Sequence, residues 1–233
     1  DIVHVEGSID PQRDISIIDT ELILADLGTV ERSVTRVEKA AKSGDKEAIQ
    51  KVAVFKKAGD ALSQGIPIRK AISDTDEQKL LNELHLITSK PVLYVANVDE
   101  DGVAADNDAV KTVRKIAADE NAECIKICGK LEEEIAQLSQ EERDAFLSEL
   151  GYEEPGLAVL SRAAYKLLGL ETYFTAGKTE NRAWTIKKGF KAPQAAGVIH
   201  TDFEKGFIKA DVYTLEDLET YKTEVALRAA GKI

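Results

Sequence analysis

The chain has 233 residues, of which 43% are hydrophobic and 31% are charged, so it can bury one large core or two to three small ones. No apolar run approaches the roughly 18 residues of a transmembrane helix, and no charged-then-apolar leader marks a secretory signal. The formal net charge of −11 argues against indiscriminate binding to nucleic acid, and we expect contact with neither a membrane nor DNA.

The chain contains no methionine, not even at position 1. A complete translation product would begin with one. We therefore expect this sequence to be a fragment of a longer protein.

Two amphipathic helices are predicted in the first third of the chain. From Asp14, apolar residues recur every three or four positions, the spacing of a helix with one buried face. Ser43-Gly44-Asp45 interrupts the pattern, and Asp45 can cap a second helix that runs to about Leu62. We expect an antiparallel helical hairpin whose apolar stripes bury each other. The alternative is an arm that contacts a partner.

A βαβ unit is predicted in the middle of the chain. Thr75 is the expected N-cap of a short helix. Residues 91–96 then form a short apolar run behind a proline, which favours a buried parallel strand over a helix. A helix over about 107–120 and a strand over 123–128 follow. Strand, helix and strand in this order predict parallel strands joined by a right-handed crossover.

Cys124 and Cys128 lie four residues apart on the second predicted strand, where both would face the same side. A disulfide framework is therefore not expected, and a reducing, cytoplasmic location fits.

The amino-acid composition changes in the last part of the chain. Three helices are predicted between residues 131 and 168, whereas aromatic and β-branched residues dominate from Leu170. Strands with a helix packed on one face suggest a small α+β domain. We expect strands at 172–175, 183–186 and 206–213 and helices at 194–199 and 218–230.

Polar residues follow each of the two parallel strands. Asn97, Val98 and Glu100 come after the first, and open α/β sheets bind ligands beyond the carboxyl ends of their strands. The Asn97 carboxamide can both donate and accept at a purine edge. Cys128-Gly129-Lys130 ends the second strand, where nucleotide-binding folds often place a backbone loop against the base. The simpler alternatives are a plain turn at Asn97 and a buried, structural Cys128.

Other motifs carry no chemistry. Gly177-Lys178-Thr179 imitates the end of a phosphate loop, but Thr172 stands where the pattern needs a glycine, and no helix is predicted afterwards. The three histidines are dispersed and offer no metal-ligand spacing, so no metal site is predicted.

Lysine and arginine gather between Glu171 and Lys209. This segment contains seven of them and four acidic residues, so its net charge is +3, while the rest of the chain carries −14. A basic segment on an acidic protein suggests an RNA-facing surface, and a plain solvated face is the alternative. The RNA-binding candidates are Arg182, Lys187, Lys188 and Lys205.

Six segments together resemble the Obg-like ATPase family, known as YchF. The resemblance covers essentially the whole chain, and its most specific motif is HTDFEKGFI at 200–208. The others are DIVHVEG at 1–7, NVDE at 97–100, YFTAG at 173–177, RAWTI at 182–186 and APQAAG at 192–197.

The resemblance implies an α/β fold with three parts. Residues 1–13 and 85–169 would form part of a P-loop NTPase domain with a parallel sheet, and residues 14–84 an inserted helical hairpin or coiled coil. Residues 170–233 would form an α+β ubiquitin-like TGS domain that is incomplete at its C-terminus. The family's phosphate loop, magnesium-binding threonine and switch region have no counterpart in this sequence, so the fragment is expected to be inactive alone.

The resemblance also implies a cytoplasmic, ribosome-associated P-loop nucleotide hydrolase that prefers ATP to GTP and regulates translation or the stress response. ATP and Mg²⁺ would be its cofactors, with the metal ligands in the missing N-terminal part. The ribosome, at its large subunit, and ribosomal RNA would be its partners. The alternative is a non-catalytic RNA- or ribosome-binding fragment that acts through the TGS domain and the hairpin.

By the same resemblance, Asn97 and the main chain of Val98 would meet adenine. GTP-specific relatives carry Asn-Lys-x-Asp, whereas Val98 and Glu100 replace the lysine and the guanine-reading aspartate here. Loss of that aspartate removes a discrimination that can reach several kcal/mol. The backbone of Cys128 and Gly129, with Lys130, would close over the base. His4 matches a family histidine proposed to be catalytic.

Overall fold

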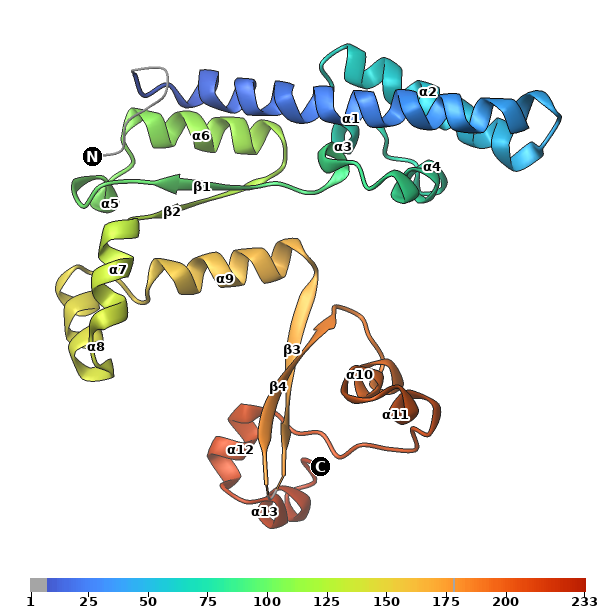
Figure 1. The fold of residues 1–233 in the computed structure, drawn as a ribbon. Helices are drawn as coiled ribbons and strands as arrows, with labels where there is room; N and C mark the ends of the chain where they lie inside the picture. The colour runs from blue at the N-terminus through green and yellow to red at the C-terminus, as the bar shows by residue number, and fades with distance from the viewer. Residues whose placement is uncertain (1–7, 178) are drawn as a thin grey trace. The chain divides into compact units, whose positions relative to one another are not determined.

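The computed structural model describes residues 8–177 and 179–233, which divide between Leu167 and Leu168 into two compact units (Figure 1). The predicted α/β class is confirmed, because the first unit contains a parallel sheet surrounded by helices. Throughout the described residues, no helix combines the length and the apolar composition needed to cross a membrane.

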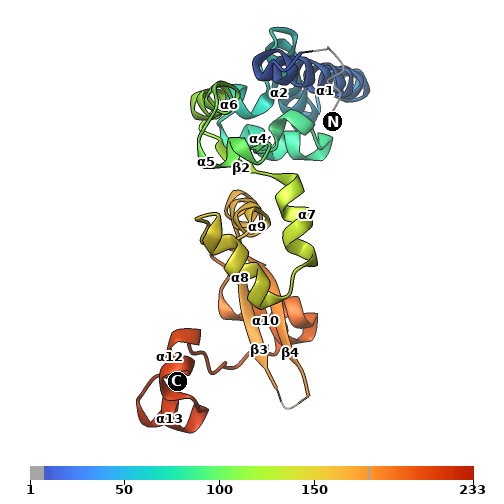
Figure 2. The same ribbon diagram turned by 90° about the vertical axis from the view of Figure 1, so that its left-hand side faces the viewer.

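The two longest helices open the first unit. α1 (Pro11–Lys42) starts three residues before the predicted Asp14 because Asp10 caps it, accepting from the Arg13 backbone N–H at 3.1 Å. α2 (Lys46–Ser63) is capped by Asp45, which accepts from the Ala48 N–H at 3.0 Å as predicted. α2 packs against the later part of α1, whereas the first part of α1 extends beyond it (Figures 1 and 2).

The main core of the first unit lies between these helices and the segment that follows them. Val30 of α1 and Phe55, Ala58 and Leu62 of α2 are almost completely buried. The following segment closes the core with four short elements: α3 (Ile68–Ala71), α4 (Thr75–Leu81) and the 3₁₀ turns η1 (Asn82–Leu84) and η2 (Ile87–Ser89).

The predicted cap of α4 is wrong by one residue. Asp74, not Thr75, is the N-cap, and its carboxylate accepts from the N–H groups of Asp76 at 3.0 Å and Glu77 at 2.9 Å. Aspartate and threonine both cap helices, so composition alone does not choose between neighbours.

The strand, helix and strand order and the parallel pairing are confirmed, but the first strand is not buried: none of its residues is fully buried, and Val95 is 42% exposed. β1 (Leu93–Asn97) and β2 (Glu123–Ile127) are parallel, in a register that pairs Leu93 with Glu123 and Asn97 with Ile127. α5 (Asp101–Ala104) and α6 (Asp108–Asp119) connect them, and Asn107 caps α6 by accepting from the Val110 N–H at 2.9 Å. Cys128, expected at the end of the second strand, lies just beyond β2.

Three helices complete the first unit. α7 (Gly129–Gln137) begins directly after β2, and α8 (Gln140–Glu149) follows with a capping box between Ser139 and Glu142. α9 (Gly156–Leu167) packs against β2. All three lie within two residues of the predicted boundaries.

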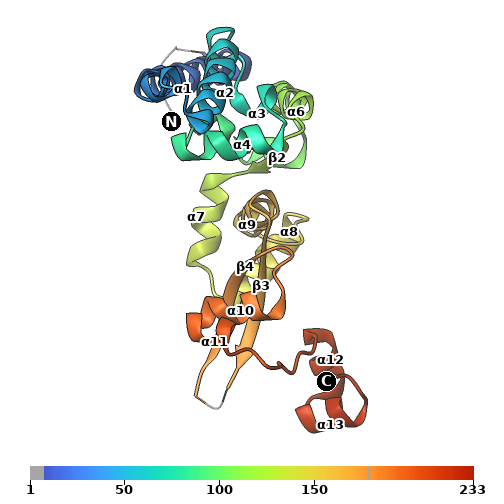
Figure 3. The ribbon, with the colours of Figure 1, turned by 90° about the vertical axis from the view of Figure 1, so that its right-hand side faces the viewer.

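The second unit is built on an antiparallel hairpin of β3 (Leu170–Ala176) and β4 (Asn181–Lys187), whose register pairs Leu170 with Lys187. α10 (Ala192–Ile199) packs against β4, and α11 (Thr201–Lys205) packs against α10 (Figure 3). The Tyr173 hydroxyl donates to the Ala195 carbonyl at 2.9 Å, which fixes α10 on one face of the hairpin.

Two predictions fail in the second unit. Residues 206–213 form no strand, and Ile208 and Val212 are 91% and 74% exposed. A strand needs a neighbour for its backbone groups, and no described segment pairs with this one. The single helix expected at 218–230 is two helices, α12 (Leu215–Tyr221) and α13 (Glu224–Ala229), because Lys222 takes a left-handed conformation with φ +63°.

Candidate functional site

The candidate site lies at the carboxyl ends of β1 and β2. Because the strands are parallel and Asn97 pairs with Ile127, the chain leaves both strands at the same edge of the sheet. The Val98 N–H donates to the Ile127 carbonyl at 2.9 Å and extends the ladder by one bond. The two loops that the sequence nominated therefore start side by side.

Asn97 connects these two loops. Its side chain is exposed at the end of β1, and its Oδ1 accepts from the Gly129 backbone N–H at 3.0 Å. The carboxamide is thereby held with its NH₂ group as the remaining donor. A Cβ added to Gly129 would lie 3.4 Å from the Asn97 Oδ1, an ordinary contact, so this position has room for alanine.

The turn after Asn97 is closed by Asp99. Its Oδ1 accepts from the Gly102 N–H at 2.9 Å, and Gly102 is buried. A Cβ on Gly102 would lie 2.9 Å from that oxygen and 3.0 Å from the Val98 Cβ, which real structures do not tolerate. The Asp99 carboxylate therefore serves the backbone of its own turn.

Glu100 and Lys130 form an ion pair between the two loops. The Lys130 Nζ lies 2.6 Å from the Glu100 Oε1, and the side chains are 70% and 51% exposed. The hydrogen bond to Glu100 raises the pKa of Lys130 above its ordinary value. Lys130 therefore carries its positive charge at neutral pH.

The cysteines have structural surroundings. Cys128 is 4% exposed at the start of α7, in accord with the simpler interpretation of a small buried hydrophobe. Cys124 lies on β2, and burial raises the pKa of its thiol, which lowers the thiolate population. Neither cysteine forms a disulfide.

A carboxylate that the sequence reasoning missed links the site to α9. Glu132 of α7 accepts from the Gly156 N–H at 2.6 Å and from the Leu157 N–H at 3.1 Å, so one helix caps the next. A Cβ on Gly156 would lie 2.9 Å from Glu132. The Pro155-Gly156 start of α9 was a visible signal, but its cap lies 24 residues away in the sequence.

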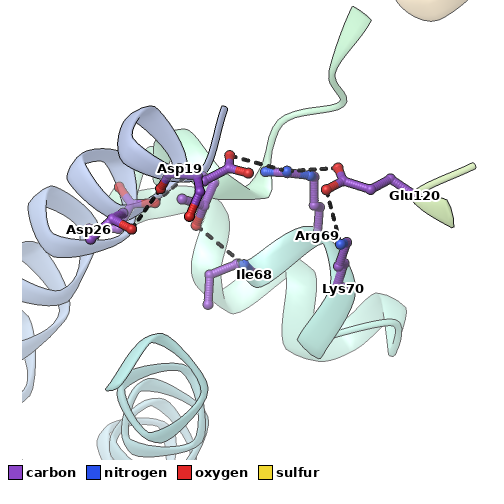
Figure 4. Close-up of polar contacts among 9 residues, drawn as sticks. Asp19, Asp26, Ile68, Arg69, Lys70 and Glu120 are labelled. Carbon is purple, nitrogen blue, oxygen red and sulfur yellow. Dashed lines mark hydrogen bonds and ion pairs between the residues drawn. The ribbon is translucent and has the colours of Figure 1, made fainter. Parts of the chain in front are cut away.

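A second missed group joins α1, α3 and the end of α6. Arg69 lies 2.9 Å from Glu120 and 3.6 Å from Asp19, and Lys70 lies 3.0 Å from Glu120 (Figure 4). Burial opposes ionisation of Glu120, but its hydrogen bonds from Arg69 and Lys70 leave the pKa of this carboxyl below its ordinary value. Burial, and then the charges of Glu120 and Asp19, raise the pKa of Tyr94 to about 12.

Two grooves of the first unit lie beside α1. A groove of about 540 Å³ is lined by residues that include Ile15, Ile18, Ile87 and Tyr94. Asn97, Glu100 and Gly129 line neither of these grooves.

The four RNA-binding candidates all lie exposed on the second unit. Arg182 stacks 4.3 Å over the ring of Trp184, which preorganises its guanidinium. Arg182 and Lys187 differ by an odd number of positions on β4 and so lie on opposite faces of the strand. Lys188 follows β4 and Lys205 ends α11, so the candidates are spread rather than gathered on one strand face.

Two further site predictions concern His4 and a metal ion. His4 lies outside the described residues. Across residues 8–177 and 179–233, no three His, Cys, Asp or Glu side chains gather in a way that could hold a metal ion.

Comparison with known proteins gives consistent matches. A family model, YchF-GTPase_C, described as "Protein of unknown function (DUF933)", matches residues 170–233. The chain is 51% identical over 234 residues to a Bacillus subtilis protein named ribosome-binding ATPase YchF, covering 100% of this chain and 64% of that protein. It is 41% identical over 238 residues to Obg-like ATPase 1 of Rattus norvegicus, with 100% and 60% covered.

A solved structure agrees. The Schizosaccharomyces pombe YchF GTPase superposes with a TM-score of 0.84 at 37% identity, covering 100% of this chain and 64% of that one. The chain thus spans about 64% of the length of the Bacillus relative and of the solved structure that it matches.

Proposed function

Because the chain belongs to the YchF and Obg-like ATPase family, we propose that it is part of a ribosome-associated nucleotide hydrolase that prefers ATP to GTP. Hydrolysis would cleave a phosphoanhydride bond, and the protein would act in the cytoplasm on translation or the stress response. Relatives named ribosome-binding ATPases support the ribosome as partner. Its large subunit and ribosomal RNA are the contacts that we propose.

The observation that carries the proposal is the bond from the Gly129 N–H to the Asn97 carboxamide at 3.0 Å. It joins the two loops expected to enclose a base at the ligand-binding edge of a parallel sheet. Asn97 would donate its NH₂ group to a purine. The Val98 N–H is used by Ile127, so the Val98 carbonyl is the main-chain group that would accept from the adenine amino group.

Three further points concern the base, the metal ion and the catalytic group. An exposed carboxamide at the end of a parallel strand suits the base of ATP. The described residues do not fit a Mg²⁺ site, so we derive no step through a metal. A catalytic role for His4 stays a prediction.

We also propose the three-part organisation for this chain. The main core of the first unit is built entirely from residues between Ile23 and Leu86, which supports an inserted helical domain at 14–84 within a nucleotide-binding domain of 1–13 and 85–169. The second unit starts at Leu168, and the family model starts at residue 170, which supports a separate TGS domain.

The test is nucleotide binding by the full-length protein that contains this chain. The double variant Val98→Lys, Glu100→Asp restores the guanine-reading pattern, and we expect its preference to move from ATP toward GTP. Asn97→Ala should weaken ATP binding by up to about tenfold, the worth of one hydrogen bond. An unchanged preference in the double variant would show that this turn does not select the base.

A second candidate function rests on the second unit. Its exposed cations, with Arg182 stacked on Trp184, suit a non-catalytic RNA- or ribosome-binding role for the piece. Ribosome co-sedimentation at rising salt tests it, because phosphate contacts weaken steeply with salt. Binding that ignores both salt and charge reversal at Lys187 and Lys188 would exclude it.

A further inference from the structure

We propose that Lys130 is a specificity residue of the base turn, because its ion pair occupies the Glu100 carboxylate that guanine would otherwise use. The inference rests on the proposed function and concerns the choice between ATP and GTP. Replacing the aspartate by Glu100 still leaves a carboxylate that guanine could bind, and Lys130 would hinder that binding.

The need for such a residue follows from the chemistry of the two bases. Guanine presents two neighbouring N–H donors, on N1 and on its exocyclic amino group, to which one carboxylate can bind. Adenine offers an acceptor at N1 beside its amino donor. Glutamate is longer than aspartate by one methylene but keeps the same anionic acceptor. Unless something occupies it, the flexible Glu100 side chain remains an acceptor for guanine.

The ion pair with Lys130 occupies the Glu100 carboxylate. The Lys130 Nζ lies 2.6 Å from the Glu100 Oε1. The loops that carry the two side chains are already joined by the Asn97 to Gly129 hydrogen bond at 3.0 Å, so little further ordering is needed to form the pair. Lys130 directly follows Gly129, which places the pair beside the proposed base position.

The neighbouring acid is also occupied. Asp99 accepts from the Gly102 N–H at 2.9 Å. A side chain at position 102 would disturb this contact, because an added Cβ would lie 2.9 Å from the Asp99 Oδ1. Both carboxylates next to Val98 thus have partners within the protein. GTP would have to break one of these contacts, whereas ATP would not.

The size of the effect follows from the exposure of the pair. Exposed ion pairs are weak, so we expect the pair to change binding by no more than about fivefold. A pair that stabilises the fold weakly can still shift selectivity by this factor, because only one of the two nucleotides must break it. Lys130 therefore adjusts the preference that Glu100 and Val98 establish.

The experiment measures ATP and GTP dissociation constants for the full-length protein by competition with a fluorescent nucleotide. Lys130→Ala should lower the ratio of GTP to ATP dissociation constants by about three- to fivefold, through tighter GTP binding. In a Glu100→Gln background, Lys130→Ala should have no further effect on the ratio.

Lys166→Ala is the matched control. Lys166 forms an exposed pair with Glu123 at 3.0 Å, and Glu123 begins β2 at the end of the strand opposite the site. This variant should leave both dissociation constants unchanged, and circular dichroism checks that every variant is folded.

The outcomes separate the two proposals. If the wild-type protein binds neither nucleotide, or if Asn97→Ala leaves ATP binding unchanged, the base site itself is wrong and this inference falls with it. If ATP binding depends on Asn97 but the ratio is the same in the wild type and in Lys130→Ala, only the role of Lys130 is overturned.

Discussion

At the scale of single residues, Asp26 shows how one buried charge organises its surroundings. It is 3% exposed on α1, and its two oxygens accept from the N–H groups of Ile87 at 2.9 Å and Thr88 at 2.7 Å. Thr88 in turn accepts from the Ile68 N–H at 3.2 Å (Figure 4). A buried carboxylate is stable only with such partners, so α1 and the residues before β1 are joined at this point.

Asp26→Ala should lower the free energy of unfolding by about 3 kcal/mol, because it leaves one buried and one partly buried N–H group without an acceptor. Asp26→Asn retains one oxygen acceptor and should cost about half as much. Urea unfolding followed by circular dichroism measures both. Asp76→Ala is the control, since the Asp76 side chain is 88% exposed and its loss should change stability by less than about 0.5 kcal/mol. Equal effects of Asp26→Ala and Asp76→Ala would contradict the assignment.

At the scale of elements, helices carry the connections between distant parts of the first unit. α7 begins where Gly129 binds Asn97 and caps α9 through Glu132. α1 packs against both α2 and α6 (Figure 1). Local signals set where these helices start, but their partners come from elsewhere in the chain. α1 also contains Gly28 in its interior, where glycine lowers helix stability.

Gly28→Ala should stabilise the chain by about 0.5 to 1 kcal/mol, because alanine loses less backbone entropy in a helix. An added Cβ would meet only the flexible end of Arg32, at 3.4 Å. Thermal unfolding of the two proteins measures the difference.

Gly44→Ala is the matched counterpart in the turn between α1 and α2. Gly44 has φ +91°, where an L side chain is strained, so alanine should destabilise by about 1 to 2 kcal/mol. The description of α1 and its turn would be contradicted if both glycines responded with the same sign.

At the scale of the whole molecule, each unit is held together in its own way. The first unit depends on contacts between residues far apart in sequence, such as Arg69 with Glu120. The second unit depends on its hairpin and on α10, fixed by Tyr173. The ion pairs of Glu120 and the partly buried Tyr94 make the stability of the first unit sensitive to pH at both extremes.

Stability should be greatest near neutrality and decline on both sides. The lowered pKa of Glu120 contributes stability that is present above the ordinary glutamate pKa and is lost as the pH falls through the lowered value. The pKa of Tyr94, raised to about 12, contributes stability that is complete below about pH 10 and is lost as the pH rises toward 12.

Urea unfolding at a series of pH values measures this dependence. Tyr94→Phe should flatten the decline between about pH 10 and 12, and Glu120→Gln should flatten the acid side. If Tyr94→Phe unfolds with the same alkaline slope as the wild type, Tyr94 is not the group responsible for the decline.

Local sequence patterns predicted much of the fold for a physical reason. Periodicity, caps and glycine act within one or two turns of chain, so the two long helices, the βαβ unit and the strands of the β3 and β4 hairpin could be read directly. Asn97, Glu100 and Gly129 were nominated in the same way, from their place after the strands.

Contacts between distant residues could not be read from these patterns. The sequence by itself determined which segments are helical or extended and which polar residues end the parallel strands. Only the tertiary structure decided that Lys130 forms an ion pair with Glu100, that Glu132 caps α9 and that residues 206–213 have no strand partner among the described residues. A hydrogen bond or an ion pair depends on a few ångströms between groups that the chain brings together only when it folds.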